Sequence, residues 1–190
     1  MGSCFFIGHR ETPDRVYPTL LETIERHITE YGVSEFVVGQ YGSFDRLVIR
    51  ALSQAKRAHP DITLMLMTPY YPVNRKVDLP EEFDALFYPP DLETVPKRLA
   101  IIRANRYMVE RSDFLIAYVR HPASNAKELL EYGLVQRPAQ YAWKSRLYFR
   151  LSQVRVLCLR PSLWQTGRHF SGGIDGGVPA RCRAGSLSPP

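Results

Sequence analysis

The first 132 residues predict an α/β fold, with a mainly parallel sheet and helices on both of its faces. Two observations lead to this expectation. Strand and helix patterns alternate along this part of the chain, as they do in βαβ units. In addition, three short apolar segments run directly into polar turns, and each turn opens a helix. In parallel sheets, ligands bind outside the carboxyl ends of the strands, where helix N-termini favour anions.

Each expected strand is a short apolar run bounded by polar or turn-forming residues. The expected strands are residues 3–7, 35–38, 62–67, 86–88 and 114–119. The expected helices carry apolar side chains at three- and four-residue spacing. They are predicted to begin after residues 12–14, near Ser43, near Pro96 and near Ala126. Gly32 is expected to end the first helix, because glycine readily adopts the left-handed conformation found there.

The charge divides the chain into two parts. Residues 1–132 carry 18 Asp and Glu against 16 Lys and Arg, whereas residues 133–190 carry one acid, Asp175, against nine basic residues. We therefore expect an α/β domain over residues 1–135. Residues 136–190, rich in Arg, Gly, Ser and Pro, are expected to form a largely disordered extension. Residues 154–159 could add one further strand.

Composition also limits the class of protein. No run of about 18 apolar residues is present, so the sequence predicts no contact with a membrane. Cys4, Cys158 and Cys182 match neither a zinc-site spacing nor a disulfide framework. The chain enters its first strand without a secretory signal. We therefore expect a cytoplasmic protein without a metal site, and the sequence identifies no cofactor.

The turn after the first strand holds Gly8, His9 and Arg10. Histidine and arginine are costly to bury, and both can bind an anion. The turn is therefore interpreted as part of an anion site, with an ordinary surface turn as the alternative.

The second strand runs into a short turn with Gly39, Gly42 and Ser43. Glycines let the backbone approach a phosphate closely, although a simple tight turn explains the spacing equally well. Asp45 follows in the first turn of the helix. It either complements the helix dipole or accepts a hydrogen bond from a ribose hydroxyl.

Polar residues flank the last of these strands on both sides. Arg103, Asn105 and Arg106 precede it, and His121, Ser124 and Asn125 follow it. The arginines fit either a phosphate site or a solvated helix face, and Ser or Asn at a helix start is often only an N-cap. Glu128 lies one turn into the following helix, where its carboxylate either faces a ligand sugar or pairs with the helix dipole.

Three segments together resemble one known group of proteins. They are Cys-Phe-Phe-Ile-Gly-His-Arg (4–10), Val-Gly-Gln-Tyr-Gly-Ser-Phe-Asp-Arg-Leu-Val (38–48) and Arg-Ala-Asn-Arg-Tyr-Met-Val-Glu-Arg-Ser-Asp (103–113). They resemble the short YpsA-like branch of the SLOG superfamily, which also contains the DNA-processing protein DprA and the LOG phosphoribohydrolases. The resemblance covers residues 3–132. It implies a Rossmann-like sheet that binds nucleotides or related ligands, without an established reaction.

In the LOG enzymes, a Pro-Gly-Gly-x-Gly-Thr-x-x-Glu turn carries a glutamate that serves hydrolysis of the N-glycosidic bond of a nucleoside monophosphate. By resemblance, Glu128 falls on that glutamate and Asn125 on the threonine, while Arg103 lies one residue out of step with the LOG catalytic arginine. The glycines of the turn are replaced here by His121, Pro122 and Ser124. These replacements favour phosphate binding over hydrolysis.

Relatives of this kind continue the last helix and add another strand, a continuation that is expected to be absent here from Gly133 onward. An absent strand would leave an open sheet edge and favour homo-oligomers. The basic extension fits either a frame-shifted or recombined end, or a tail that contacts nucleic acid.

The leading hypothesis is a protein that binds or senses a nucleotide or a nucleotide derivative such as ADP-ribose or NAD. One alternative is a LOG-like hydrolase of N-glycosidic bonds, with Glu128 acting on the sugar or water and Arg103 or Arg106 holding phosphate. Another is a DprA-like binder of single-stranded DNA, which requires a basic groove with aromatic residues. The near-neutral charge of residues 1–132 argues against DNA binding except through the basic extension.

Overall fold

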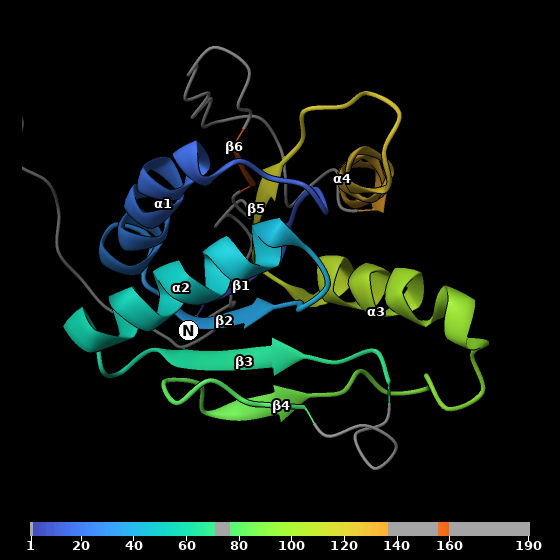
Figure 1. The fold of residues 1–190 in the computed structure, drawn as a ribbon, viewed down its shortest axis with the longest axis horizontal. Helices are drawn as coiled ribbons and strands as arrows, with labels where there is room; N and C mark the ends of the chain where they lie inside the picture. Colours follow the sequence, from blue (N-terminus) through green and yellow to red (C-terminus); the bar gives the residue numbers. More distant parts are fainter. Residues whose placement is uncertain (1, 71–76, 137–155, 160–190) are drawn as a thin grey trace, which may run out of the picture.

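The computed structural model describes residues 2–70, 77–136 and 156–159. Its strands form one six-stranded sheet in the order β4-β3-β2-β1-β5-β6, in which β1 to β5 are parallel and β6 is antiparallel to β5 (Figure 1). The strands are β1 (Gly2–Ile7), β2 (Val33–Val38), β3 (Thr63–Met67), β4 (Ala85–Phe87), β5 (Phe114–Tyr118) and β6 (Val156–Leu159). The helices are α1 (Tyr17–Thr29), α2 (Ser43–Ala58), α3 (Lys97–Arg111) and α4 (Asn125–Gln136), and a single 3-10 turn, Asp14–Val16, precedes α1. The predicted α/β, Rossmann-like fold is therefore confirmed.

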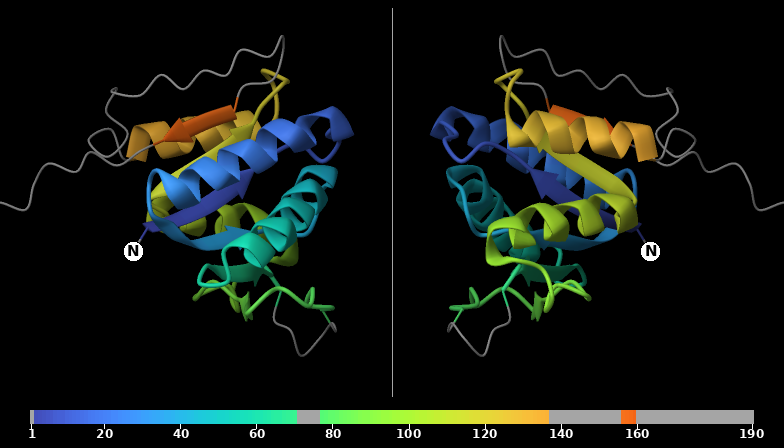
Figure 2. Two further views of the ribbon diagram at one scale, coloured as in Figure 1. Left: turned by 90° about the vertical axis from the view of Figure 1, so that its left-hand side faces the viewer. Right: turned by 90° about the vertical axis from the view of Figure 1, so that its right-hand side faces the viewer.

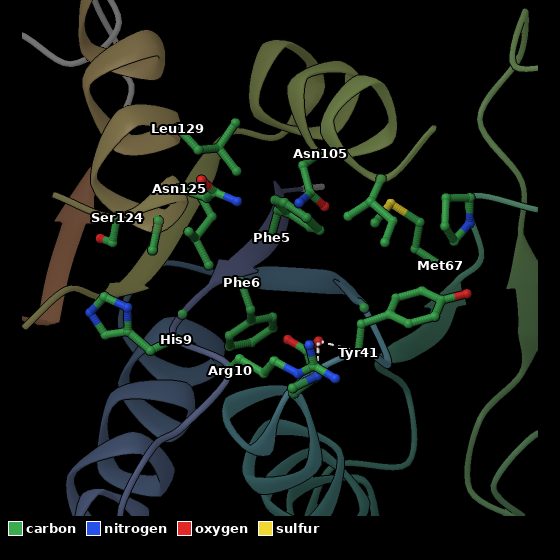
Figure 3. Close-up of a pocket in the computed structure, with 18 residues that line it drawn as sticks. Phe5, Phe6, His9, Arg10, Tyr41, Met67, Asn105, Ser124, Asn125 and Leu129 are labelled. Carbon is green, nitrogen blue, oxygen red and sulfur yellow. Dashed lines mark hydrogen bonds between the residues drawn. The ribbon is translucent and has the colours of Figure 1, made fainter. Parts of the chain in front are cut away.

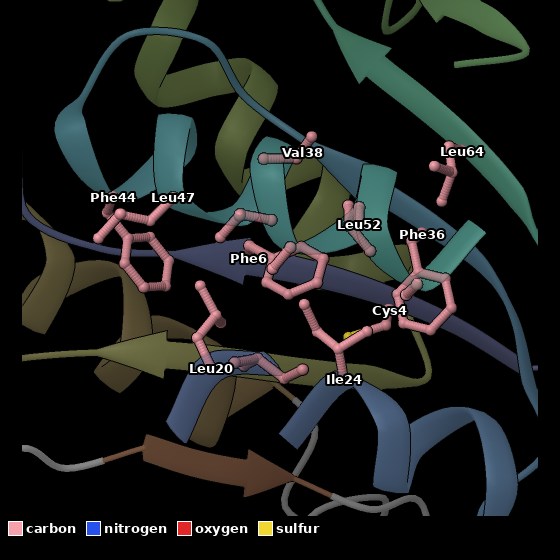
Figure 4. Packing of buried hydrophobic residues seen from close by; sticks show 14 of the residues in the cluster. Cys4, Phe6, Leu20, Ile24, Phe36, Val38, Phe44, Leu47, Leu52 and Leu64 are labelled. Atoms are coloured by element: carbon pink, nitrogen blue, oxygen red, sulfur yellow. The ribbon is translucent and has the colours of Figure 1, made fainter. Parts of the chain in front are cut away.

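Helices cover both faces of the sheet (Figure 2). One apolar cluster joins α1 and α2 to one face, with Phe6, Leu20 and Leu52 among its buried members (Figure 4). A second cluster joins α3 and α4 to the other face and contains Phe5 and Met108. Phe5 and Phe6 point to opposite faces because successive side chains of a strand alternate. Each face of the parallel sheet is thus buried, as its apolar strands require.

The chain reverses its direction across the sheet at β1. From β1 it adds β2, β3 and β4 on one side, and it then returns to place β5 on the other side of β1. The helix after β1 packs on one face, and the helix after β5 packs on the opposite face. Such a point opens a crevice outside the carboxyl ends of the strands, where ligands of α/β proteins bind.

Two expectations about the end of the domain are wrong. α4 does not stop at Gly133 but continues to Gln136. Gly133 is buried, and a Cβ placed there would lie 2.8 Å from a methyl carbon of Val109, so this glycine lets α4 pack closely on α3. The edge of β5 is not open, because β6, which comes from the predicted extension, pairs with it. The rest of the extension lies outside the described residues.

Gly32 has the predicted left-handed conformation after α1, with φ of +64°. No helix in the described part of the chain is long and apolar enough to cross a membrane.

Candidate functional site

A cavity of about 520 Å³ lies outside the carboxyl ends of β1, β2, β3 and β5 and extends between α3 and α4 (Figure 3). It brings together nine of the fourteen residues that the sequence marked as candidates. These are Gly8, His9, Arg10, Gly39, Gly42, Asp45, Asn105, Ser124 and Asn125. The three turns that were expected to meet at the strand ends therefore do line one cavity.

The other five candidates are not part of the cavity lining. They are Ser43, Arg103, Arg106, His121 and Glu128. The Arg106 guanidinium lies over the ring of Tyr132, 4.9 Å from its centre, so it helps to join α3 to α4. Arg103, His121 and Glu128 have exposed side chains. The expected grouping of Glu128 with Arg103 or Arg106 around a bound sugar is therefore not present at this cavity.

Ser43 joins two loops instead of facing a ligand. Its backbone N–H and its hydroxyl both donate to the carbonyl oxygen of Arg10, each at 2.8 Å. The same hydroxyl oxygen accepts a hydrogen bond from the backbone N–H of Thr12 at 2.6 Å. These contacts fix the turn after β1 against the start of α2, and they explain why a hydroxyl residue stands at this position.

His9 connects the turn after β1 with the turn after β5. Its Nε2 atom accepts hydrogen bonds from the backbone N–H groups of Arg120, at 2.6 Å, and His121, at 3.2 Å. An accepting Nε2 requires a neutral ring that carries its proton on Nδ1. Burial, followed by the charges of His121 and Arg120, lowers the pKa of His9 below its ordinary value, which favours the same neutral form. His9 thus holds two strand ends together and does not act as a cation.

The glycine turn after β2 is held by Asp45. Asp45 Oδ2 accepts hydrogen bonds from the backbone N–H groups of Tyr41, at 2.8 Å, and Gly42, at 3.2 Å (dashed in Figure 3). Burial raises the pKa of Asp45, while these two hydrogen bonds and the charge of Arg46 oppose the rise. The N–H groups of Tyr41 and Gly42, like that of Ser43, are therefore already used within the protein.

The glycines of these turns are required by close packing. A Cβ on Gly8 would lie 2.1 Å from Cγ of Phe44, a buried residue of α2. A Cβ on Gly42 would lie 3.1 Å from the Cα of Arg10. Gly8 and Gly42 thus allow β1 and α2 to approach each other, which supports the tight-turn interpretation of the turn at Gly42.

Free backbone donors remain at the start of α4. The carbonyl oxygen of Ser124 accepts the N–H groups of Lys127 and Glu128, at 2.9 and 3.0 Å, as an N-cap residue does. The N–H groups of Asn125 and Ala126 have no acceptor within the described part of the chain, and both residues line the cavity. The first N–H groups of a helix carry partial positive charge and bind anions. This end of the cavity is therefore suited to a phosphate or carboxylate.

Charged groups in the cavity lining are few. Arg10 and Asp45 are the charged side chains among the lining residues, since His9 is neutral. The Arg10 side chain is exposed and forms no ion pair with any described residue. Arg10 is thus available to an anionic ligand.

The sequence did not identify the apolar part of the lining. Tyr41, Met67, Pro69, Ile101 and Leu129 belong to it. Figure 3 shows Met67 and Tyr41 on one side of the cavity, with His9, Ser124 and Asn125 on the opposite side. Tyr41 was detectable, because it stands between two candidate glycines. Ile101 was detectable as well, because it precedes the candidate Asn105 by one helical turn.

The described residues contain no group of three or more His, Cys, Asp or Glu side chains that could hold a metal ion. A scan of the chain against protein-family models finds no matching family, and a search of curated proteins finds no significant match. The resemblance to the SLOG superfamily therefore stays a prediction from the quoted segments.

Proposed function

We propose that this protein binds or senses a nucleotide or a nucleotide-derived ligand, such as a nucleoside monophosphate, ADP-ribose or NAD. The observation that carries the proposal is the convergence of three strand-end turns on one cavity of about 520 Å³. It is lined by the N–H groups of Asn125 and Ala126 and by the guanidinium of Arg10, which have no partner among the residues that the structure describes. Pockets of this size commonly hold small ligands and cofactors.

The division of the lining supports a ligand with one anionic and one apolar end. The polar side contains His9, Ser124 and Asn125, and its donors suit a phosphate. The opposite side contains Met67 and Tyr41, which can contact the face of a base. A nucleotide combines both properties in one molecule.

The two alternative functions receive less support from the geometry. Hydrolysis of an N-glycosidic bond was assigned to Glu128, which is exposed and is not part of the cavity lining. Single-stranded DNA binding requires a groove with several cations. Among the described residues that line the cavity, Arg10 is the one cationic side chain, because His9 is neutral. Neither alternative is therefore proposed.

The test is the melting temperature and the heat of binding of the full chain with AMP, ADP-ribose and NAD. At least one ligand is expected to raise the melting temperature and to bind with one-site stoichiometry. Arg10→Gln is expected to weaken binding about tenfold, because a charge-assisted hydrogen bond is lost. Arg15→Gln is the matched control, because Arg15 is exposed on the same connection but does not line the cavity. Absence of binding by all three ligands in a folded preparation would overturn the proposal.

A further inference from the structure

The Asp45 carboxylate has one oxygen that the protein does not use. Oδ2 accepts both backbone N–H groups of the glycine turn, from Tyr41 and Gly42. Oδ1 has no hydrogen-bond donor among the residues that the structure describes. Asp45 lines the cavity and is half-buried. Its Oδ1 therefore keeps contact with solvent, and a bound ligand can supply a hydrogen-bond donor there in place of water.

The surroundings of Asp45 limit what that donor can be. An anionic group of a ligand cannot lie at Oδ1, because the Asp45 carboxylate would repel it. Arg10 lines the same cavity but forms no ion pair with Asp45. A divalent cation prefers several oxygen ligands, and Asp45 is the one carboxylate among the lining residues described. The remaining partner is a neutral donor, either a hydroxyl or an amino group.

The position of Asp45 favours a hydroxyl. It lies at the start of α2, just beyond the carboxyl end of β2, and its Oδ2 would lie 3.2 Å from a Cβ placed on Gly39. The missing Cβ of Gly39 thus lets the Asp45 carboxylate lie close to the main chain at the end of β2. The surface that suits a base comes from Met67 of β3, Ile101 of α3 and the ring of Tyr41, whose backbone N–H donates to Asp45. A sugar lies between the phosphate and the base in a nucleotide, and its hydroxyls are the donors closest to the middle of the molecule.

Resting on the proposed function, we propose that Asp45 selects ligands with a free ribose hydroxyl, which donates a hydrogen bond to Oδ1. The start of α4 takes the phosphate of the same ligand. The site therefore favours ribonucleotides over their deoxy counterparts. It also disfavours nucleotides that carry a phosphate on the recognised hydroxyl, since that phosphate would face the carboxylate.

Asp45→Asn separates this role from the structural role of the same side chain. The amide oxygen of Asn can accept the N–H groups of Tyr41 and Gly42 in place of Oδ2, so the turn keeps its acceptor. The amide nitrogen then takes the place of Oδ1 and removes both the charge and the acceptor. Asp84→Asn is the matched control. Asp84 Oδ2 also accepts a backbone N–H, from Leu64 at 2.7 Å, but Asp84 does not line the cavity.

The experiment measures dissociation constants by calorimetry for the full-length wild type, Asp45→Asn and Asp84→Asn. The ligands are AMP, 2′-deoxy-AMP, 3′-deoxy-AMP and IMP, and ADP-ribose is titrated in parallel so that a site that rejects AMP is still tested. One of the two deoxy ligands is expected to bind the wild type about tenfold more weakly than AMP, while IMP binds like AMP. Asp45→Asn is expected to weaken AMP and ADP-ribose by a similar factor and to remove the preference over the deoxy ligand. Asp84→Asn is expected to retain both properties.

The outcomes distinguish the two proposals. Equal binding of AMP and both deoxy ligands, with unchanged affinity in Asp45→Asn, overturns the role of Asp45 and leaves the proposed function intact. A loss of affinity for IMP alone assigns the donor to the base and also overturns it. Absence of binding by every ligand overturns the proposed function itself. If Asp45→Asn does not fold, the wild-type ratio of AMP to its deoxy forms decides.

Discussion

His9→Phe isolates the link between the turns after β1 and β5. His9 is 8% exposed, and its Nε2 accepts hydrogen bonds from the backbone N–H groups of Arg120 and His121. The ring also makes an edge contact with Tyr118, with 5.6 Å between the ring centres. Phenylalanine keeps an aromatic ring in this position but has no acceptor. The substitution therefore removes two hydrogen bonds while much of the packing is retained.

The expected loss in the free energy of unfolding follows from these two hydrogen bonds. A typical intramolecular hydrogen bond contributes about 1 kcal/mol net, and a buried donor left without a partner costs about 1–3 kcal/mol. The expected loss in the free energy of unfolding is therefore about 2–3 kcal/mol. For a domain whose stability is about 5–15 kcal/mol, this loss is large enough to measure without unfolding the protein.

The assay is urea denaturation of the wild type, His9→Phe and His9→Gln, followed by circular dichroism. The midpoint is expected to fall in His9→Phe while the m-value stays constant. His9→Gln restores a neutral acceptor and is expected to lose less stability than His9→Phe. A His9→Phe protein within about 0.5 kcal/mol of the wild type, the range of ordinary surface substitutions, would show that these bonds do not hold the two turns together.

Two further predictions concern packing and pH. Gly8→Ala places a methyl group 2.1 Å from Cγ of Phe44 and is expected to cost about 3 kcal/mol, whereas Gly32→Ala, at φ of +64° with no atom within 4 Å, is expected to cost about 1 kcal/mol. Equal losses for the two variants in urea denaturation would contradict the packing role of Gly8. Burial lowers the pKa of His27, so the unfolded chain binds more protons than the folded protein below the unfolded-state pKa of about 6.5. The free energy of unfolding is therefore expected to fall as pH decreases from 7.5 to 5.5, and a slope that is the same in His27→Phe would assign the effect to other groups.

The parallel sheet could be predicted because its signals are local. Apolar runs such as residues 36–38 and 114–118, separated by helical patterns, are sufficient to indicate strands that are buried on both faces. The end of α4 could not be placed from the sequence, because the change in composition at Gly133 does not coincide with the end of the helix. The missing Cβ of Gly133 serves the contact with Val109, a residue 24 positions earlier in the chain. Long-range packing of this kind leaves no local pattern.

The candidate site was predicted in its location but less well in its chemistry. The turns at Gly8 and Gly39 were expected to offer N–H groups to an anion, but a sequence does not show which donors the protein itself uses. Asp45 takes two of the donors in the second turn, and the donors without an acceptor in the described part of the chain lie at Asn125 and Ala126. The choice among polar residues of α3 was equally uncertain, because neighbouring positions on a helix face different directions. Asn105 lines the cavity, whereas the arginines on either side of it do not.

The central claim is that the strand-end cavity receives the anionic part of a nucleotide. It is tested most directly by nuclear magnetic resonance of isotope-labelled full-length protein titrated with AMP and with ADP-ribose. At saturation, the largest amide shifts are expected at Asn125 and Ala126, the two free donors of α4, together with Gly8 and Arg10 at the end of β1. Saturable binding that leaves these four amides unchanged and shifts residues elsewhere would contradict the account.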